Sequence, residues 1–229
     1  MYQVIGLTKT LSAFAITCLG LFLLLNFYHL PDLWAGPLQG FQRPVMSAAW
    51  WGGVLFYLLG ETPAFVWLCK APVIRKILPP IDGEWDVHLQ SNWGVMQKWL
   101  GQGDGALLDS LQGKVKIKAR FSKVQMQFEA DTKYSDSKTI SVSVRPSEQM
   151  GLIELNYMYV NYTRIPLPTD TNTHTGAARI FVKEHGEDLI MEGTYFTDRK
   201  WTEGLNTAGT ITFTRSKVAA SKDLADGKA

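Results

Sequence analysis

The fold is decided near the end of the chain, by the stretch Leu189-Ile-Met-Glu-Gly-Thr-Tyr-Phe-Thr-Asp-Arg199. Polar and apolar residues alternate through it, and a second alternating run, Gly209-Thr-Ile-Thr-Phe-Thr-Arg215, follows after a loop. This pattern predicts a hairpin of two β-strands. Because alternate side chains of a strand share one face, one side of the first strand should hold Met191, Gly193, Tyr195, Thr197 and Arg199.

This face changes from apolar to polar along the strand. It begins with Leu189 and Met191 and ends with Tyr195, Thr197 and Arg199. A tyrosine ring offers a stacking surface, and an arginine offers a planar fork of donors that suits a phosphate group. The polar end is therefore typical either of a pocket mouth for a flat anionic ligand or, more simply, of a strand end that reaches water.

The first 79 residues have a different character. Between Lys9 and Asp32 there is no charged residue for 22 positions, which meets the length of about 20 that a bilayer core requires. A second apolar run, Ser47 to Cys69, carries aromatic residues near both ends, as membrane interfaces prefer. Residues 1–79 are thus predicted to form a membrane hairpin of two transmembrane helices. A cleaved signal peptide is the alternative for the first run.

The basic residues set the expected orientation of this hairpin. Lys70, Arg75 and Lys76 follow the second run, whereas the loop between the two runs holds only Arg43. The positive-inside rule then places the loop outside and both termini, with everything after residue 79, in the cytoplasm.

Glu61 lies within the second apolar run and is followed by Thr62 and Pro63. An acid inside a membrane is costly and is commonly functional, so Glu61 is a candidate membrane or oligomer residue. The alternative is that the helix is kinked at Pro63 and that Glu61 lies near the inner interface.

Composition excludes several classes of function. The formal net charge of +2 is no argument for binding a nucleic-acid polymer, which would require a clustered basic face. Both cysteines, Cys18 and Cys69, fall in the apolar part, which excludes a disulfide framework in the rest of the chain. The four histidines are scattered and no nucleophile elbow is present. We therefore expect no catalytic residues, no metal and no cofactor, and a binding module instead of an enzyme.

Residues 80–217 have the pattern of an all-β domain. The first strand runs from Gly83 to Gln90, and a helix, a turn and a short helix are expected between Trp93 and Leu111. Seven further strands are predicted to begin near Gln112, Val124, Ile140, Leu152, His174, Leu189 and Ala208. Eight short consecutive strands favour an up-and-down β-barrel with a helical insertion after strand 1. Such a barrel has room for one small ligand. Residues 218–229 are expected to be a disordered tail.

The strand from Leu152 to Tyr159 leaves two possible inward faces. One contains Glu154 and Asn156, and the other contains Ile153, Leu155, Tyr157 and Tyr159. The second set is the more apolar and is therefore favoured as the interior of the barrel.

Two resemblances follow from these motifs. The opening Gly83-Glu-Trp85, together with Arg215 on the last strand, resembles the lipocalin and calycin signature, in which an arginine packs across the first-strand tryptophan and closes one end. The whole order of parts, with the Gly193 to Arg199 strand, resembles the two-transmembrane β-barrel effectors of CBASS, the bacterial anti-phage system that signals with cyclic oligonucleotides.

The CBASS resemblance implies a function and a location. A cyclic dinucleotide made after infection would bind the barrel, the protein would form a homo-oligomer, and its helices would disrupt the lipid of the inner membrane and kill the infected cell. The chain would be a multi-pass protein of the bacterial inner membrane. The alternative is a constitutive membrane-anchored calycin-like carrier or scaffold, with a barrel lined by aliphatic residues for an apolar ligand.

Seven residues are candidates for binding the cyclic dinucleotide. Tyr157 and Tyr195 would stack on the bases, and Thr197 and Arg199 would contact phosphates or base edges. Asn156, Asn206 and Thr207 are additional candidates.

Overall fold

The computed structural model describes residues 1–102, 108–130, 135–149, 151–185 and 188–216. The chain divides into two compact units. The first contains residues 1–80 and 120–122, and the second contains residues 81–119 and the chain from residue 123 onward. The tail predicted to be disordered, residues 218–229, lies outside the described part.

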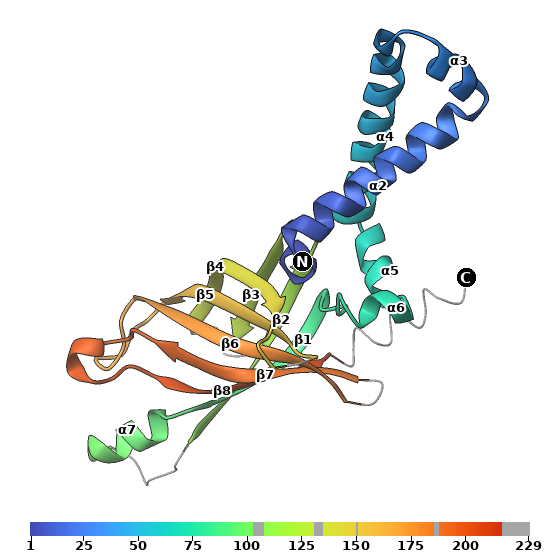
Figure 1. The fold of residues 1–229 in the computed structure, drawn as a ribbon. Coiled ribbons are helices and arrows are strands. Elements are labelled where there is room, and N and C mark those ends of the chain that lie inside the picture. Colours follow the sequence, from blue (N-terminus) through green and yellow to red (C-terminus); the bar gives the residue numbers. More distant parts are fainter. Residues whose placement is uncertain (103–107, 131–134, 150, 186–187, 217–229) are drawn as a thin grey trace, which may run out of the picture. The chain divides into compact units, whose positions relative to one another are not determined.

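The first unit is helical. Its elements in chain order are α1 (Tyr2–Ile5), α2 (Leu7–Leu25), η1 (Phe27–His29), α3 (Leu30–Ala35), η2 (Leu38–Phe41), α4 (Gln42–Glu61), α5 (Ala64–Lys70) and α6 (Pro72–Arg75). Helix α2 packs against α4 (Figure 1), where Gly52 leaves room for the sulfur of Cys18 and the ring of Phe14 meets that of Phe56 edge to face at 5.5 Å. Within the described residues, α2 alone is long and apolar enough to cross a membrane.

The second predicted span, Ser47 to Cys69, is divided between two helices. Helix α4 ends at Glu61, and α5 continues from Ala64 at an angle of 70°. The break contains Pro63, which has no backbone N–H to continue a helix. The kink considered at Pro63 is therefore present. Because α4 and α5 qualify as a membrane span only when taken together as a bent pair, the two-helix membrane hairpin stays a prediction.

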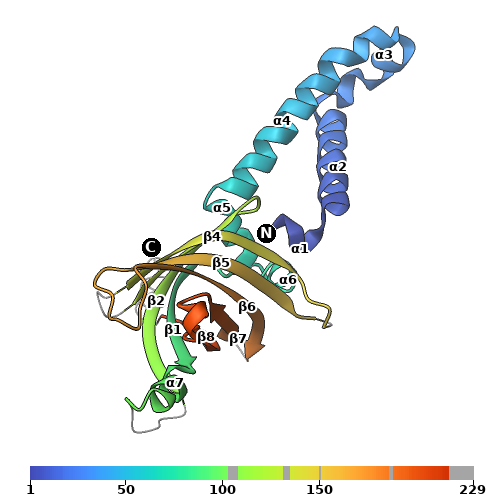
Figure 2. The ribbon, with the colours of Figure 1, turned by 90° about the vertical axis from the view of Figure 1, so that its left-hand side faces the viewer.

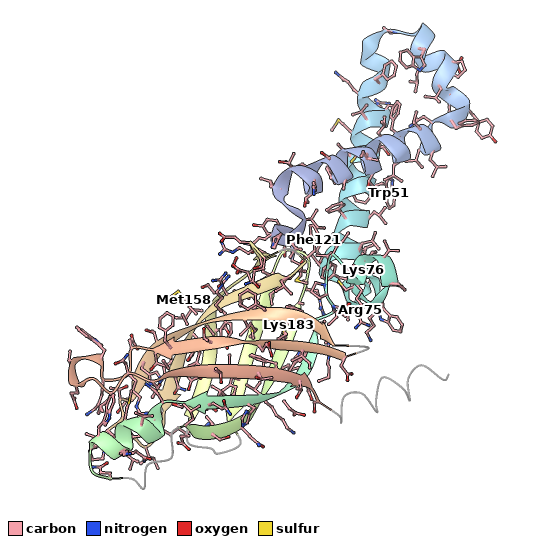
Figure 3. All side chains as sticks on the ribbon, turned by 60° about the horizontal axis from the view of Figure 1, so that its bottom comes forward. Trp51, Arg75, Lys76, Phe121, Met158 and Lys183 are labelled. Atoms are coloured by element: carbon pink, nitrogen blue, oxygen red, sulfur yellow. The ribbon has the colours of Figure 1, made fainter. Side chains whose placement is uncertain are left out.

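Residues 120–122 belong to this helical unit although they connect two strands of the barrel. The ring of Phe121, labelled in Figure 3, lies 5.7 Å from that of Phe56 and 6.0 Å from that of Phe65. The backbone N–H of Ser122 donates a hydrogen bond to Glu61 Oε1 at 2.9 Å. Glu61 thus has a definite packing role, and its role in the membrane or in an oligomer stays a prediction.

The second unit is a closed antiparallel barrel, and its described strands number eight. They are β1 (Gly83–Ser91), β2 (Asp109–Ala119), β3 (Val124–Ala130), β4 (Ser135–Pro146), β5 (Ile153–Thr163), β6 (Thr173–His185), β7 (Asp188–Thr197) and β8 (Ala208–Arg215). Each strand pairs with the next in sequence, and β8 returns to pair with β1 (Figure 2). The predicted up-and-down barrel of eight strands is confirmed.

The helical insertion after the first strand is shorter than predicted. Helix α7 (Trp93–Trp99) is present, and a one-turn helix η3 (Trp201–Glu203) lies between β7 and β8. The predicted second short helix, up to Leu111, is wrong at its end, because Asp109 to Leu111 begin β2 and pair with Ser91 to Leu89 of β1. The spacing of the leucines favoured a helix, but hydrogen bonding to the neighbouring strand imposes an extended backbone. Residues 103–107 lie outside the described part.

One half of the barrel is filled by a packed core. Five of its side chains are completely buried: Trp85, Leu155, Ile180, Met191 and Phe213. The indole Nε1 of Trp85 donates to the carbonyl oxygen of Ile81 at 2.9 Å. The guanidinium carbon of Arg215 lies 4.1 Å from the centre of the Trp85 ring, and its Nη1 donates to the carbonyl oxygen of Asp82 at 2.6 Å. The predicted arginine–tryptophan closure of one end is confirmed.

The outward face of β5 carries a buried carboxylate. Glu154 lies between Arg145 of β4 and Arg179 of β6, and both arginines form ion pairs with it on the outside of the barrel. Arg179 Nη2 donates to the Glu154 carboxylate at 2.6 Å. Burial alone would raise the pKa of Glu154, but hydrogen bonds from Arg179, Asn156 and Arg145 lower it to about 2. Met158, labelled in Figure 3, lies on the same outer surface and is half exposed. The more apolar set, with Leu155 and Tyr157, therefore faces inward as favoured.

Candidate ligand-binding cavity

Beyond the packed core, the barrel encloses a cavity of about 330 Å³, within the usual range of roughly 300–1,000 Å³ for small-molecule sites. Its wall comes from the strands of the barrel together with Trp93 of α7, Asp170 of the β5–β6 loop, and Arg199 and Thr207 of the β7–β8 connection. The β7 strand and the residues that follow it contribute to both the packed core and the cavity. Met191 is in the core, whereas Tyr195, Thr197 and Arg199 line the cavity.

Aromatic rings form a large part of the wall. Tyr157 and Tyr159 are successive inward residues of β5, and their ring centres are 5.8 Å apart. Tyr195 of β7 also lines the cavity. Burial raises the pKa of all three hydroxyls, so they stay protonated at neutral pH and can donate hydrogen bonds. Gly176 of β6 makes space for this group, because a Cβ there would collide with the ring of Tyr159.

Two threonines join the ends of β7 and β8 at the cavity wall. The hydroxyl oxygens of Thr197 and Thr207 are 2.9 Å apart, and the backbone N–H of Thr207 donates to Thr197 Oγ1 at 3.1 Å. Both residues line the cavity, where the sequence placed them. Their hydroxyls also bond to each other, so they hold the wall together whether or not a ligand is bound.

Arg199 lines the cavity just after the end of β7 and is largely buried. It forms an ion pair with Asp170 and donates from Nη2 to the carbonyl oxygen of Thr169 at 3.1 Å. The guanidinium carbon lies 4.3 Å from the centre of the Trp93 ring. Arg199 is therefore held in place from three sides, and Asp170 occupies part of the donor fork that a phosphate would use.

Two predicted residues lie away from the cavity. Asn156 is on the outer face of β5, where its Nδ2 donates to Glu154 Oε1 at 3.0 Å. Asn206 is exposed in the β7–β8 connection and is absent from the cavity wall. Asn156 is therefore not a cavity residue, because it alternates with the inward residues of β5. Asn206 lies in a loop, where no alternation fixes the direction of a side chain.

Among the cavity residues that the sequence analysis does not name as ligand-binding are Trp93, Asn161, Asp170 and His174. Alternation alone places Asn161 in the interior, because it lies two positions after Tyr159 on the same face of β5. His174, near which a strand was predicted to begin, lies inside β6 opposite Asn161. Trp93 and Asp170 come from a helix and a loop, and only the folded chain brings them to Arg199.

Asn161 and His174 form a neutral polar part of the wall. Asn161 Nδ2 donates to Ser137 Oγ at 3.0 Å. Burial lowers the pKa of His174, and the positive charge of Arg199 lowers it further, although Asp198 and Asp170 act in the opposite direction. The imidazole is therefore neutral at pH 7 and offers one donor and one acceptor.

Stacking rings, a buried arginine and neutral hydrogen-bonding groups together suit a planar, polar, anionic ligand. The fold and cavity define a β-barrel ligand-binding domain. Its wall includes aliphatic residues such as Leu89, Val115 and Ile211, but it is not the purely aliphatic lining that the carrier alternative predicted.

The comparisons with known proteins agree with this class. The family model of the Cap15 cyclic dinucleotide receptor domain matches residues 77–215, and the chain belongs to this family. CD-NTase-associated protein 15 of Escherichia albertii is 29% identical to it over 137 residues, which are 60% of this chain and 62% of that protein. The chain thus matches less than two thirds of this relative's length. The family confirms the resemblance to CBASS effectors that the order of parts indicated.

Proposed function

We propose that this chain is a membrane-anchored receptor and effector of CBASS, and that it binds a cyclic dinucleotide in the barrel cavity. The observation that carries the proposal is the joint presence of stacking tyrosines and a buried arginine in one cavity of a Cap15 receptor domain. A cyclic dinucleotide presents two planar bases and two phosphates, and these are the groups that such side chains recognise.

The binding free energy available from these contacts is sufficient for a signalling ligand. Stacking contributes roughly 1–3 kcal/mol per base, and a hydrogen bond to a charged phosphate contributes about 1.5–3 kcal/mol. Tyr157 and Tyr195 as stacking partners, with Arg199 and Thr197 as hydrogen-bonding partners, would then supply on the order of 8 kcal/mol, which corresponds to micromolar binding before entropic costs. Thr197 and Thr207 would position the wall beside Arg199.

The first test is a calorimetric titration of the full chain, in detergent, with a panel of cyclic di- and trinucleotides. We expect at least one cyclic dinucleotide to bind with a dissociation constant of about 1 μM or below. If a folded protein binds none of them, the receptor function is wrong, and the calycin-like carrier becomes the better account of the barrel.

We further propose that ligand binding promotes self-association and that the helical unit then disrupts the inner membrane, in a multi-pass arrangement with both termini and the barrel in the cytoplasm. Three observations support this step: the apolar helix α2, the joint length and hydropathy of α4 and α5, and the basic residues that follow them. Arg75 and Lys76, labelled in Figure 3, belong to that basic group.

Glu61→Gln tests the effector step without changing the cavity. Glutamine retains an oxygen that can accept the hydrogen bond from Ser122, but it removes the charge. In dye-loaded liposomes that contain the original chain, we expect the cyclic dinucleotide to cause release of the dye. If the carboxylate acts in the membrane, Glu61→Gln should release at least about threefold less dye. Ligand affinity should be unchanged.

Equal dye release from both proteins would leave Glu61 with only its packing role. An absence of ligand-dependent release from the original chain, despite binding, would contradict membrane disruption itself and leave the helices as an anchor.

A further inference from the structure

Three buried polar atoms among the described residues lack a hydrogen-bond partner: Asn161 Oδ1, Thr171 Oγ1 and His174 Nδ1. All three belong to the β5–β6 hairpin. Asn161 and His174 are direct partners in the register of the two strands, and both line the cavity. Buried polar groups in folded proteins nearly always have partners. Two such atoms at adjacent positions of one cavity wall therefore indicate a wall built to bond with the contents of the cavity.

The amide of Asn161 is held in a fixed position. Ser137 of β4 is its register partner on the other side, and its hydroxyl receives the hydrogen bond from Asn161 Nδ2. Ser137, Asn161 and His174 thus form one row across three neighbouring strands. In either orientation of the amide, one of its polar atoms bonds to Ser137, and the other is buried without a partner in the unliganded chain, so that a small rotation of the side chain would bring it to a ligand.

The chemistry of this row differs from that of the Arg199 end. The amide and the hydroxyl carry no charge, and the buried imidazole of His174 is neutral at pH 7. A phosphate would gain more from the guanidinium of Arg199 than from these neutral groups. Donors and acceptors of this kind match instead the polar edge of a nucleobase.

The neighbouring aromatic residue gives the base a platform. Tyr159 precedes Asn161 on the same face of β5, at a spacing of roughly 7 Å for two residues of a strand. A base stacked near Tyr159 has its polar edge at the level of the next inward residue. The cavity therefore offers stacking and edge recognition side by side.

We propose that Asn161, supported by Ser137 and joined by His174, reads the hydrogen-bonding edge of one base of the bound cyclic dinucleotide, and so determines which bases are accepted. This inference rests on the proposed receptor function. Arg199 supplies attraction that is common to all cyclic dinucleotides, because every member of the class carries the same phosphates. Asn161 and His174 supply the difference between them.

The test compares affinity ratios across ligands that share a backbone and differ in one base. The full chain, Asn161→Ala, Arg199→Ala and Asn156→Ala are titrated with the tightest cyclic dinucleotide of the panel and with a weaker one. Asn161→Ala should weaken the tightest ligand about tenfold and bring the ratio of the two affinities toward one. Arg199→Ala should weaken both ligands by a similar factor and leave the ratio unchanged.

Asn156→Ala is the matched control. It removes the same side chain from the same strand, but from the outer face, where it contacts Glu154. Both affinities and their ratio should stay at the original values.

A second measurement needs no variant. A cyclic dinucleotide methylated on the nitrogen of the pairing edge is titrated against the original chain and should bind about tenfold more weakly than its parent. An unchanged ratio in a folded Asn161→Ala protein, or equal binding of the methylated ligand, would overturn the inference and assign the unpaired atoms to water. If the original chain binds no member of the panel, the receptor function fails and this inference fails with it.

Discussion

Arg199→Ala is expected to lower the affinity for the cyclic dinucleotide by about 1.5–3 kcal/mol, which is roughly 10- to 150-fold. The reason is the loss of the buried guanidinium that lies in the cavity wall between Trp93 and Asp170. Calorimetry on the full chain measures the change. Thermal melting without ligand establishes that the variant remains folded.

The ion pair with Asp170 gives this prediction a matched partner. In the unliganded chain, Asp170 uses part of the guanidinium fork, so a phosphate must compete with a carboxylate for the same donors. Asp170→Asn should therefore bind the ligand more tightly than the original chain, in the opposite direction to Arg199→Ala. The double variant should have the same ligand affinity as Arg199→Ala, because without the arginine there are no donors for the carboxylate and the phosphate to compete for.

The double variant is needed because Arg199→Ala also removes the cation that faces the buried carboxylate of Asp170, and this change could itself weaken binding of an anionic ligand. If the single variant binds weakly only because of that carboxylate, the double variant will recover affinity. Near-original affinity in the double variant, or in Arg199→Ala itself, would show that Arg199 is a structural residue of the barrel mouth.

Trp85→Ala is expected to destabilise the barrel by about 3–5 kcal/mol. Its ring is completely buried and is covered by Arg215, and its indole N–H is bonded to Ile81. Removing the ring leaves a void in the packed half and an arginine without its aromatic partner. Urea unfolding followed by the circular dichroism of the sheet measures the loss as a lower midpoint.

Trp85→Phe is the graded control. It keeps an aromatic ring under Arg215 and removes the hydrogen bond and part of the buried area, so about 1–2 kcal/mol is expected. Because Trp85 does not line the cavity, either variant should still bind the ligand where it is folded. An unchanged midpoint for Trp85→Ala would mean that the closed end of the barrel contributes little to its stability.

The sequence was informative where side-chain alternation is strict. Met191, Tyr195 and Thr197 share the inward face that alternation predicted, and Trp85 meets Arg215 as the strand motif indicated. Alternation also predicts that Asn161, two positions after Tyr159, faces inward. It could not supply Trp93 or Asp170, since their approach to Arg199 depends on where a helix and a loop return to the barrel.

The helical part shows a second limit. The apolar run through Glu61 had the length of a span, but length and hydropathy do not fix the backbone direction at Pro63. The bend between α4 and α5 follows from the missing N–H and from local packing around Phe121.

The division of the barrel into a packed half and a hollow half has a consequence for how this receptor can diversify. Mutations that reach Leu155, Ile180 or Phe213 act on a filled core and are removed by selection for folding. Mutations in the hollow half change the wall of an empty space and leave that core intact. Substitutions in the hollow half can therefore change which ligand the cavity accepts without unfolding the barrel that holds it.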